Sequence, residues 1–167
     1  MDKICAFFDC QGFYIDGDFA PREAAYTDFY KTCHFSVDPN WKCSTISEAD
    51  QRSSAYLMEN HHGLSILMGD GENLPADMLK LEIEKCYRRT RSVFRVAVKS
   101  KEADEYLASC GIPTINLLIY GATHKNIDDG SVHPCSLHCK DICAKPRCAL
   151  ANVHLMRKWV ESKRKLI

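Results

Sequence analysis

Short apolar runs at the start of the chain predict strands that are separated by turn residues. Residues 4–9 form an apolar run that ends in an acid, which is the pattern of a buried strand. Asp16-Gly17 supplies turn residues, so Tyr14-Ile15 and residues 23–26 are expected on a following hairpin. Residues 29–37 alternate between apolar and polar well enough to predict a third strand.

Two helices are predicted in the middle of the chain. Ser47 is expected to cap the first of them, and Gly63 is expected to end it. The second helix is expected to have Asn73 as its cap and Pro75 in its first turn, where proline is tolerated. Its apolar stripe is expected to end before Arg89.

Strands and helices alternate in the second half of the chain. The predicted elements are a strand at 93–98, a helix at 101–109, a strand at 112–120 and a last helix at about 147–161. This order predicts an α/β domain with flanking helices and a mixed sheet, antiparallel at its start and parallel later. No repeat or linker divides the chain, so residues 1–167 are expected to form a single domain.

Composition limits the class of protein. Apolar residues make up 46% of the chain and charged residues 26%, as in globular domains. No apolar run approaches the roughly 18 residues of a membrane helix, and the run after Met1 is too short for a secretory signal. An intracellular protein without membrane contact is therefore expected. Its ten cysteines are expected to be thiols or metal ligands.

The charge of the chain is balanced, with a net charge of zero, so no overall field attracts nucleic acid. The C-terminal segment is a local exception, with five cations at Arg157, Lys158, Lys163, Arg164 and Lys165. These cations either suit the dipole at a helix end or form an edge that contacts phosphates. Under the second interpretation, Arg157 and Lys158 are candidates for RNA contacts.

Six cysteine and histidine residues lie within sixteen positions near the last predicted helix: His133, Cys135, His138, Cys139, Cys143 and Cys148. Thiolate and imidazole are the ligands that zinc prefers. Cys135 and His138 can present two ligands from one turn, and Cys148 can add a third from the start of a helix. A wholly local site is also chemically reasonable, built from Cys135, His138 or Cys139, Cys143 and Cys148.

Two motifs resemble those of DnaQ-type (DEDDh) exonucleases, which have a ribonuclease H-like fold. Those enzymes begin with a strand that carries Asp-x-Glu, and the first strand here carries Asp9-Cys10-Gln11. They end with a helix marked His-x-Ala-x-x-Asp, and the last helix here reads Arg147-Cys-Ala-Leu-Ala-Asn152. The spacing is kept, while three of the functional residues are replaced.

The chain more closely resembles the Maelstrom domain, a ribonuclease H-like branch that has lost most exonuclease acids. That family carries a Glu-Cys-His-Cys zinc set, with the Glu in a proline-x-Glu-x-Ala run. Here the run is Pro21-Arg22-Glu23-Ala24-Ala25, followed by Cys135, His138 and Cys148. The chain is also similar to transposon-associated animal proteins that share its Asp-x-Gln-Gly-Phe start at Asp9 and its Asn-His-His-Gly segment at 60–63.

The resemblance implies a structural zinc held by Glu23, Cys135, His138 and Cys148, which would pin the last helix to the sheet. It implies binding of single-stranded RNA, or of silencing-pathway proteins, in small-RNA (piRNA) silencing of transposons. It also implies a place in the nucleus or the cytoplasm, including perinuclear granules. The chain has no Gly-rich phosphate loop, so no small-molecule cofactor is expected.

The residue replacements argue against two-metal exonuclease chemistry, which needs several carboxylates around two divalent ions. Asp9 is kept, but Gln11 and Asn152 are neutral and are poorer ligands for magnesium. Arg147 stands in the place of the general base and cannot accept a proton. The remaining acid can only be guessed from chain order, as Asp70 or Asp77. The former active-site cleft is instead expected to bind RNA, with Arg147 contacting phosphate.

Two alternatives to RNA binding stay open. His61 and His62 follow a predicted helix and could act in metal-independent cleavage of single-stranded RNA, because neutral histidine suits acid–base chemistry. They could equally be histidines that stabilise the end of a helix. A protein-interaction module without nuclease activity is consistent with the zero net charge.

Overall fold

The longest strand, β1 (Ile4–Ile15), pairs with β2 (Asp18–Asp28) in an antiparallel hairpin at the centre of the sheet. The turn is Asp16-Gly17, and both residues have a positive φ (53° and 85°), as a tight two-residue hairpin turn requires. The predicted hairpin is confirmed. Its strands are longer than predicted, because the side chains beyond Asp9 continue to be buried alternately on the two faces of the sheet.

The computed structural model describes residues 4–41, 45–66, 72–90, 94–127, 134–139 and 141–164. The remaining strands are β3 (Thr32–Asp38), β4 (Leu74–Pro75), β5 (Arg95–Val98) and β6 (Thr114–Asn116). The sheet order is β4-β3-β2-β1-β5-β6. β3 is antiparallel to β2, whereas β5 is parallel to β1 and β6 is parallel to β5. The predicted α/β mixed sheet, antiparallel first and parallel later, is therefore confirmed.

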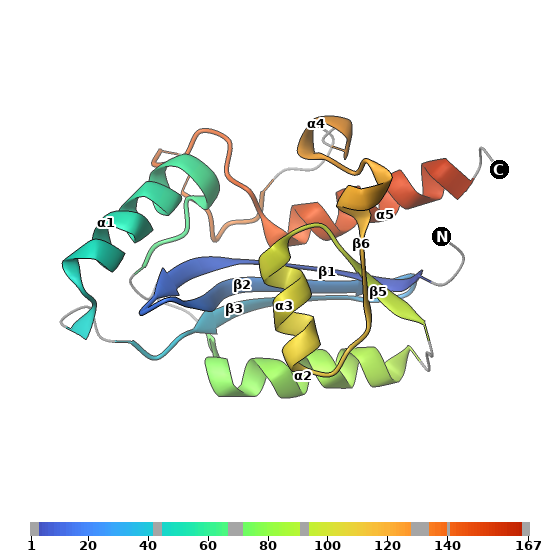
Figure 1. The fold of residues 1–167 in the computed structure, drawn as a ribbon, viewed down its shortest axis with the longest axis horizontal. Helices are drawn as coiled ribbons and strands as arrows, with labels where there is room; N and C mark the ends of the chain where they lie inside the picture. Colours follow the sequence, from blue (N-terminus) through green and yellow to red (C-terminus); the bar gives the residue numbers. More distant parts are fainter. Residues whose placement is uncertain are drawn as a thin grey trace.

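Helices lie on both faces of this sheet (Figure 1). They are α1 (Glu48–Leu57), α2 (Ala76–Arg89), α3 (Lys101–Ser109), α4 (His124–Ile127) and α5 (Ala149–Arg164). A π-helical turn (Met58–His62) extends α1, and a 3-10 helix (Leu117–Tyr120) follows β6. Among the described residues, no helix has the length and the apolar character to cross a membrane.

The alternation of side chains along β1 divides the core into two layers. Phe8 packs with residues of α2 and α3, including Leu79 and Leu107. Phe7 points to the other face and packs with residues of α5, including Val153 and Met156. Because successive side chains of a strand point to opposite faces, Asp9 lies on the same face as Phe7, under α5.

Local capping signals are confirmed for two helices. The Ser47 side chain accepts a hydrogen bond from the Asp50 amide at 3.1 Å, and Gly63 ends the π-helical turn with a φ of 66°. α3 matches its predicted range, with Ser100 as its cap. The predicted cap at Asn73 is wrong: α2 begins after Pro75 without a side-chain cap, and the Asn73 side chain accepts a hydrogen bond from Ser36 instead.

Several predicted boundaries differ from the structure. The strand predicted at 112–120 is wrong beyond Asn116, because the Asn116 side chain accepts from the Leu118 amide and starts the 3-10 helix. The third strand begins at Thr32 rather than 29, since Asp28 Oδ1 accepts from the amides of residues 30 and 31 and makes a turn there. The last helix begins at Ala149 rather than 147. The strand predicted at 93–98 is observed at Arg95–Val98, and residue 93 lies outside the described residues.

Candidate metal centre

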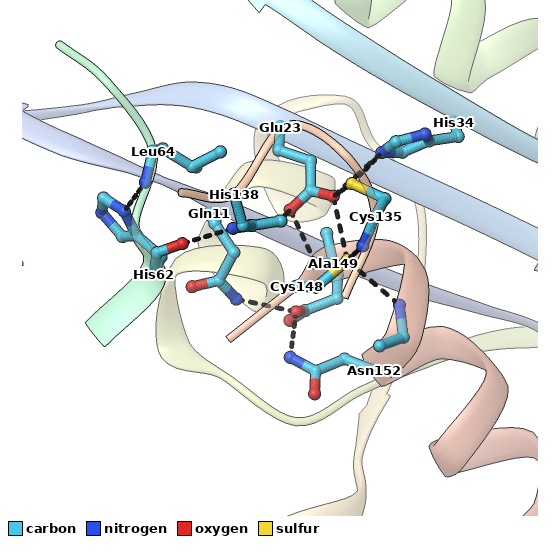
Figure 2. A network of polar contacts seen from close by, with 12 residues as sticks. Gln11, Glu23, His34, His62, Leu64, Cys135, His138, Cys148, Ala149 and Asn152 are labelled. Atoms are coloured by element: carbon cyan, nitrogen blue, oxygen red, sulfur yellow. Dashed lines mark hydrogen bonds and ion pairs between the residues drawn. The ribbon is translucent and has the colours of Figure 1, made fainter. Parts of the chain in front are cut away.

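Four side chains from separate parts of the chain converge beneath the start of α5. They are Glu23 of β2, Cys135 and His138 of the segment before α5, and Cys148, which directly precedes α5. One ligand atom from each lies within 4.8 Å of the others, so the cluster could hold a metal ion. Figure 2 shows the four side chains grouped around the Glu23 carboxylate. The set named from the sequence is thus brought together in space.

The backbone explains how each member reaches the cluster. Glu23 alternates with Ala24 and so faces α5, as Ala25 does. The Cys135 carbonyl accepts from the His138 amide at 3.4 Å, so a single turn presents both side chains. The Cys148 sulfur accepts from the Ala151 amide at 3.4 Å, as a cap at a helix start does.

Glu23 is the centre of the cluster and is completely buried. Its Oε1 lies 3.3 Å from the sulfur of Cys135 and 3.3 Å from that of Cys148. Its Oε2 lies 3.1 Å from His138 Nε2 and accepts a hydrogen bond of 2.7 Å from the Ala149 amide. A buried carboxylate is costly unless it is paired, and both oxygens of Glu23 have partners.

The pKa values describe how the cluster is charged without metal. Burial alone would raise the pKa of Glu23, but hydrogen bonds from His138 and His34 lower it. Burial likewise opposes the charge of His138, yet its contacts with Cys148 and Glu23 raise its pKa to about 10. The hydrogen bond between the two cysteines lowers the pKa of Cys148 to about 5 and raises that of Cys135. These shifts favour the charged forms of Glu23, His138 and Cys148 next to one another.

The orientation of His138 suits a metal ligand. Its Nδ1 is hydrogen-bonded to the backbone carbonyl of His62, so that nitrogen carries the proton. Its Nε2 faces Glu23 and can become a ligand when it loses its proton. Histidine ligands in proteins use this arrangement, in which a backbone carbonyl fixes the ring from its far side.

The donor atoms fit zinc by their chemistry. Two thiolates, one imidazole and one carboxylate make a four-membered set of the kinds of ligand that zinc uses, and soft thiolates disfavour magnesium and calcium. Four protein ligands would leave no open position, which is the mark of a structural site rather than a catalytic one.

The local alternative is not assembled in the described part of the chain. Cys139 is exposed and Cys143 is buried, and neither belongs to the cluster. His133, the other alternative ligand, lies outside the described residues. The distant Glu23, rather than a third local cysteine, completes the set.

The sequence analysis missed His34 of β3. Its Nε2 lies 2.9 Å from Glu23 Oε1 and 3.7 Å from the Cys135 sulfur. His34 pairs with Ala25 across the β2–β3 ladder, and paired residues share a face of a sheet. The only signal that could have found His34 is this register, which the sequence does not reveal.

A pocket of about 200 Å³ lies beside the cluster, since Gln11 in its wall pairs with Glu23 across the hairpin. All four positions matched to exonuclease motifs line it: Asp9, Gln11, Arg147 and Asn152. The side-chain amides of Gln11 and Asn152 both donate to Asp9 Oδ2, at 2.9 and 2.7 Å. Two neutral amides thus donate to one oxygen of a single buried acid.

Asp9 is fully buried, and burial raises its pKa to about 6 against the opposing hydrogen bond from Asn152. Its Oδ1 has no hydrogen-bond partner among the described residues. A carboxylate in this setting holds a proton more readily than an exposed one, because burial penalises its charged form.

The two histidines of the Asn-His-His-Gly segment have different environments. His62 accepts at Nδ1 from the Leu64 amide and donates from Nε2 to the Gly12 carbonyl, both at 3.1 Å. Burial lowers its pKa to about 4. With both nitrogens bound to the backbone, His62 is a structural residue. His61 lines the pocket, where burial and then the charge of Arg147 lower its pKa.

The other candidate residues lie away from the pocket. The Arg157 guanidinium lies 5.3 Å from the centre of the Phe29 ring, and its Nε is bonded to Glu161 at 2.9 Å. Lys158, the next residue along α5, is exposed. Asp77 is exposed in the first turn of α2 and does not line the pocket, whereas residue 70 lies outside the described residues.

Comparisons of the chain with models of protein families, with curated proteins and with solved structures found no match. The function of the protein is therefore inferred from the cluster and the pocket.

Proposed function

We propose that this protein is a zinc-stabilised domain of ribonuclease H-like type that binds single-stranded RNA in the pocket beside its metal centre. The observation that carries the proposal is that two sets of residues lie side by side: the ligand set from the Maelstrom resemblance and the positions from the DnaQ-type resemblance. The four ligands form one cluster, and the four degenerate exonuclease positions line the neighbouring pocket.

The metal centre would have a structural role, because it would hold separate parts of the chain together. Zinc, when bound, supplies a divalent charge that two thiolates, a carboxylate and an imidazole can neutralise and surround. The residues join β2 through Glu23, the preceding segment through Cys135 and His138, and the start of α5 through Cys148. Because these parts are far apart in sequence, holding them together contributes directly to folding.

The strand order supports the proposed fold type. Apart from the short β4 at the edge beside β3, three antiparallel strands are followed by two parallel strands that alternate with helices. This is the order of elements expected of a ribonuclease H-like domain. The first strand carries Asp9 under α5, and α5 carries Asn152. The first and last elements of the chain therefore meet at the pocket, as they do in the exonucleases that the chain resembles.

The walls of the pocket suit a single strand of nucleic acid. Tyr14, Phe19 and His61 are aromatic residues in its lining, and Arg147 is an exposed cation there. Single-stranded RNA is bound by stacking of unpaired bases on aromatic rings together with cationic contacts to phosphates. A volume of about 200 Å³ suits a small unit such as a single base rather than a large cofactor.

The pocket is better suited to binding than to two-metal hydrolysis. Magnesium sites of that kind need several ionised carboxylates that are free to bind metal. Here Asp9 accepts from two amides, and Glu102 accepts from the Tyr14 hydroxyl at 2.9 Å. From the resemblance, we extend the proposal to transposon silencing with protein partners in the nucleus or cytoplasm.

Binding to labelled single-stranded RNA tests this function. Arg147→Glu should weaken binding at least tenfold while the protein stays folded, because it reverses the charge at the pocket. The matched control is Lys145→Glu, which makes the same charge change at an exposed position two residues away. Equal weakening by both variants would show general electrostatic attraction. Unchanged RNA affinity in Arg147→Glu would contradict RNA binding in the pocket.

The same RNA, incubated with the protein, separates binding from cleavage. We expect intact RNA in EDTA and in magnesium or manganese. Cleavage that requires magnesium would support two-metal exonuclease activity. Cleavage in EDTA would favour acid–base chemistry by His61. No binding of any nucleic acid at low salt would leave a protein-interaction module instead.

A further inference from the structure

His34 contacts the metal centre from the side of β3, although it belongs to none of the motifs noted in the sequence. Its side chain is 26% exposed, while Glu23 beneath it is completely buried. Figure 2 shows His34 and Cys135 on the same side of the Glu23 carboxylate. His34 thus lies between the buried carboxylate and solvent.

The two oxygens of Glu23 are held by donors from two different elements. His34 Nε2 lies 2.9 Å from Oε1, and the Ala149 amide donates to Oε2 at 2.7 Å. Two such bonds fix the plane of the carboxylate. The sulfurs of Cys135 and Cys148 each lie 3.3 Å from Oε1, the same oxygen that His34 contacts.

The geometry of the cluster decides between two roles for His34. Its Nε2 lies at a hydrogen-bond distance of 2.9 Å from Glu23 Oε1. His34 is not one of the four residues whose ligand atoms all lie within 4.8 Å of one another. The four-membered set is already complete without His34, and bonds to the outer face of a ligand commonly orient it and raise metal affinity.

We propose that His34 is a positioning residue of the metal centre, which sets the orientation of the Glu23 carboxylate and shields it from solvent. This inference rests on the metal centre of the proposed function. It assigns His34 no bond to the metal, and it predicts that His34 acts only through Glu23.

Zinc affinity, measured by competition with a chelator of known affinity, tests the role. His34→Ala should weaken zinc binding about 10–100-fold, the usual effect of losing a bond that orients a ligand. His34→Gln should restore most of the affinity, because an amide N–H can still donate to Glu23 Oε1. His154→Ala, at a half-buried histidine of α5 outside the cluster, is the matched control and should bind as the wild type does.

Two further measurements exclude a direct bond. In a Glu23→Gln background, His34→Ala should cause little additional loss, since a residue that acts through Glu23 is not additive with it. The absorption spectrum of the cobalt-substituted protein should keep its four-coordinate, two-thiolate form in His34→Ala.

Specific results would overturn the proposal. His34→Gln as weak as His34→Ala, with altered cobalt bands, would make the imidazole itself a ligand. Wild-type affinity in His34→Ala would remove any role for His34. Failure of the wild type to bind zinc would instead refute the metal centre, so the two failures are distinguishable.

Discussion

Glu23 shows how a single residue can determine a site. A glutamate on a strand is ordinarily a solvent-exposed residue, yet this one is fully buried and makes contacts with β3, the 135–138 turn and the start of α5. Burial of a carboxylate is tolerated because each oxygen accepts from nitrogen donors. Removing its side chain would leave His138 and the Ala149 amide without this partner.

Asp9 is also a buried acid, and its shifted pKa makes the stability of the fold depend on pH. The pKa of Asp9 is raised from 3.8 to about 6 in the folded protein, with burial as the largest cause. The folded state therefore binds a proton more tightly than the unfolded state does. The stabilisation from this proton is complete below pH 4 and is lost as the pH rises through about 6.

We predict that Asp9→Asn stabilises the protein at pH 8. The gain in unfolding free energy should be roughly 3 kcal/mol, since one pKa unit corresponds to about 1.4 kcal/mol, and it should shrink towards zero at pH 4. The Asn oxygen can still accept from Gln11 and Asn152. Denaturant unfolding of both proteins at matched pH values measures the difference, and a gain that does not depend on pH would contradict the ionisation of Asp9 as its cause.

At the scale of elements, α5 is attached to the sheet in two ways. Its apolar side chains, including Val153, Met156 and Val160, pack against Phe7 in the second core layer. Its start is bound through polar contacts of Cys148 and the Ala149 amide with Glu23. The apolar layer holds the body of the helix, whereas the contacts with Glu23 hold its first turn.

The segment before α5 also forms part of the wall of the pocket. The Arg147 amide donates to the His61 carbonyl at 2.7 Å, and the Cys139 amide donates to the Gly63 carbonyl at 2.9 Å. Gly63 permits this approach, because a Cβ there would lie 3.0 Å from the Cys139 oxygen. The segment that carries Cys135, His138 and Cys148 is therefore hydrogen-bonded to the segment that carries His61.

Removal of zinc should loosen these elements selectively. We predict faster hydrogen exchange in residues 134–149 and 58–64 of the metal-free protein, because their backbone bonds depend on the cluster. α2 packs on the opposite face of the sheet and serves as the internal control. An equal increase in the exchange rate of α2 would mean that the metal supports the whole fold. No increase in any element would contradict a structural role for the metal.

The elements found from the sequence are those with local signals. The Asp16-Gly17 turn, the Ser47 cap and the Gly63 helix end each depend on neighbouring residues, and the structure confirms them. The short β4 and the end of β6 were missed because they depend on tertiary contacts. β4 exists only through its pairing with β3, and the apolar residues after Asn116 looked like a continued strand.

At the scale of the whole molecule, the two ends of the described chain meet on one face of the sheet. β1 and β2 supply Asp9 and Glu23, and α5 lies across them (Figure 1). The metal centre and the pocket consequently occupy neighbouring positions under the start of the same helix. This arrangement explains why ligands separated by more than 100 positions can share one ion.

The candidate site was predictable only where residues carry recognisable chemistry. The cysteines and histidines around residue 138 indicate metal binding by type and spacing, and the family resemblance added Glu23. His34 and the bonds of Asp9 to two amides depend on strand register and helix placement, which spacing along the chain does not contain. His62 was an open candidate for catalysis, and only its contacts identify it as structural.

The zinc content of the purified protein, measured with its thermal unfolding, tests the central claim most directly. We predict one zinc per chain in the wild type and in Cys139→Ser, which changes an exposed cysteine outside the cluster. Cys148→Ser should lose the metal and unfold at a clearly lower temperature. A wild type without zinc would contradict the metal centre. Zinc lost from Cys139→Ser as well as from Cys148→Ser would assign it to the local cysteines instead, because Cys139 belongs only to the local set.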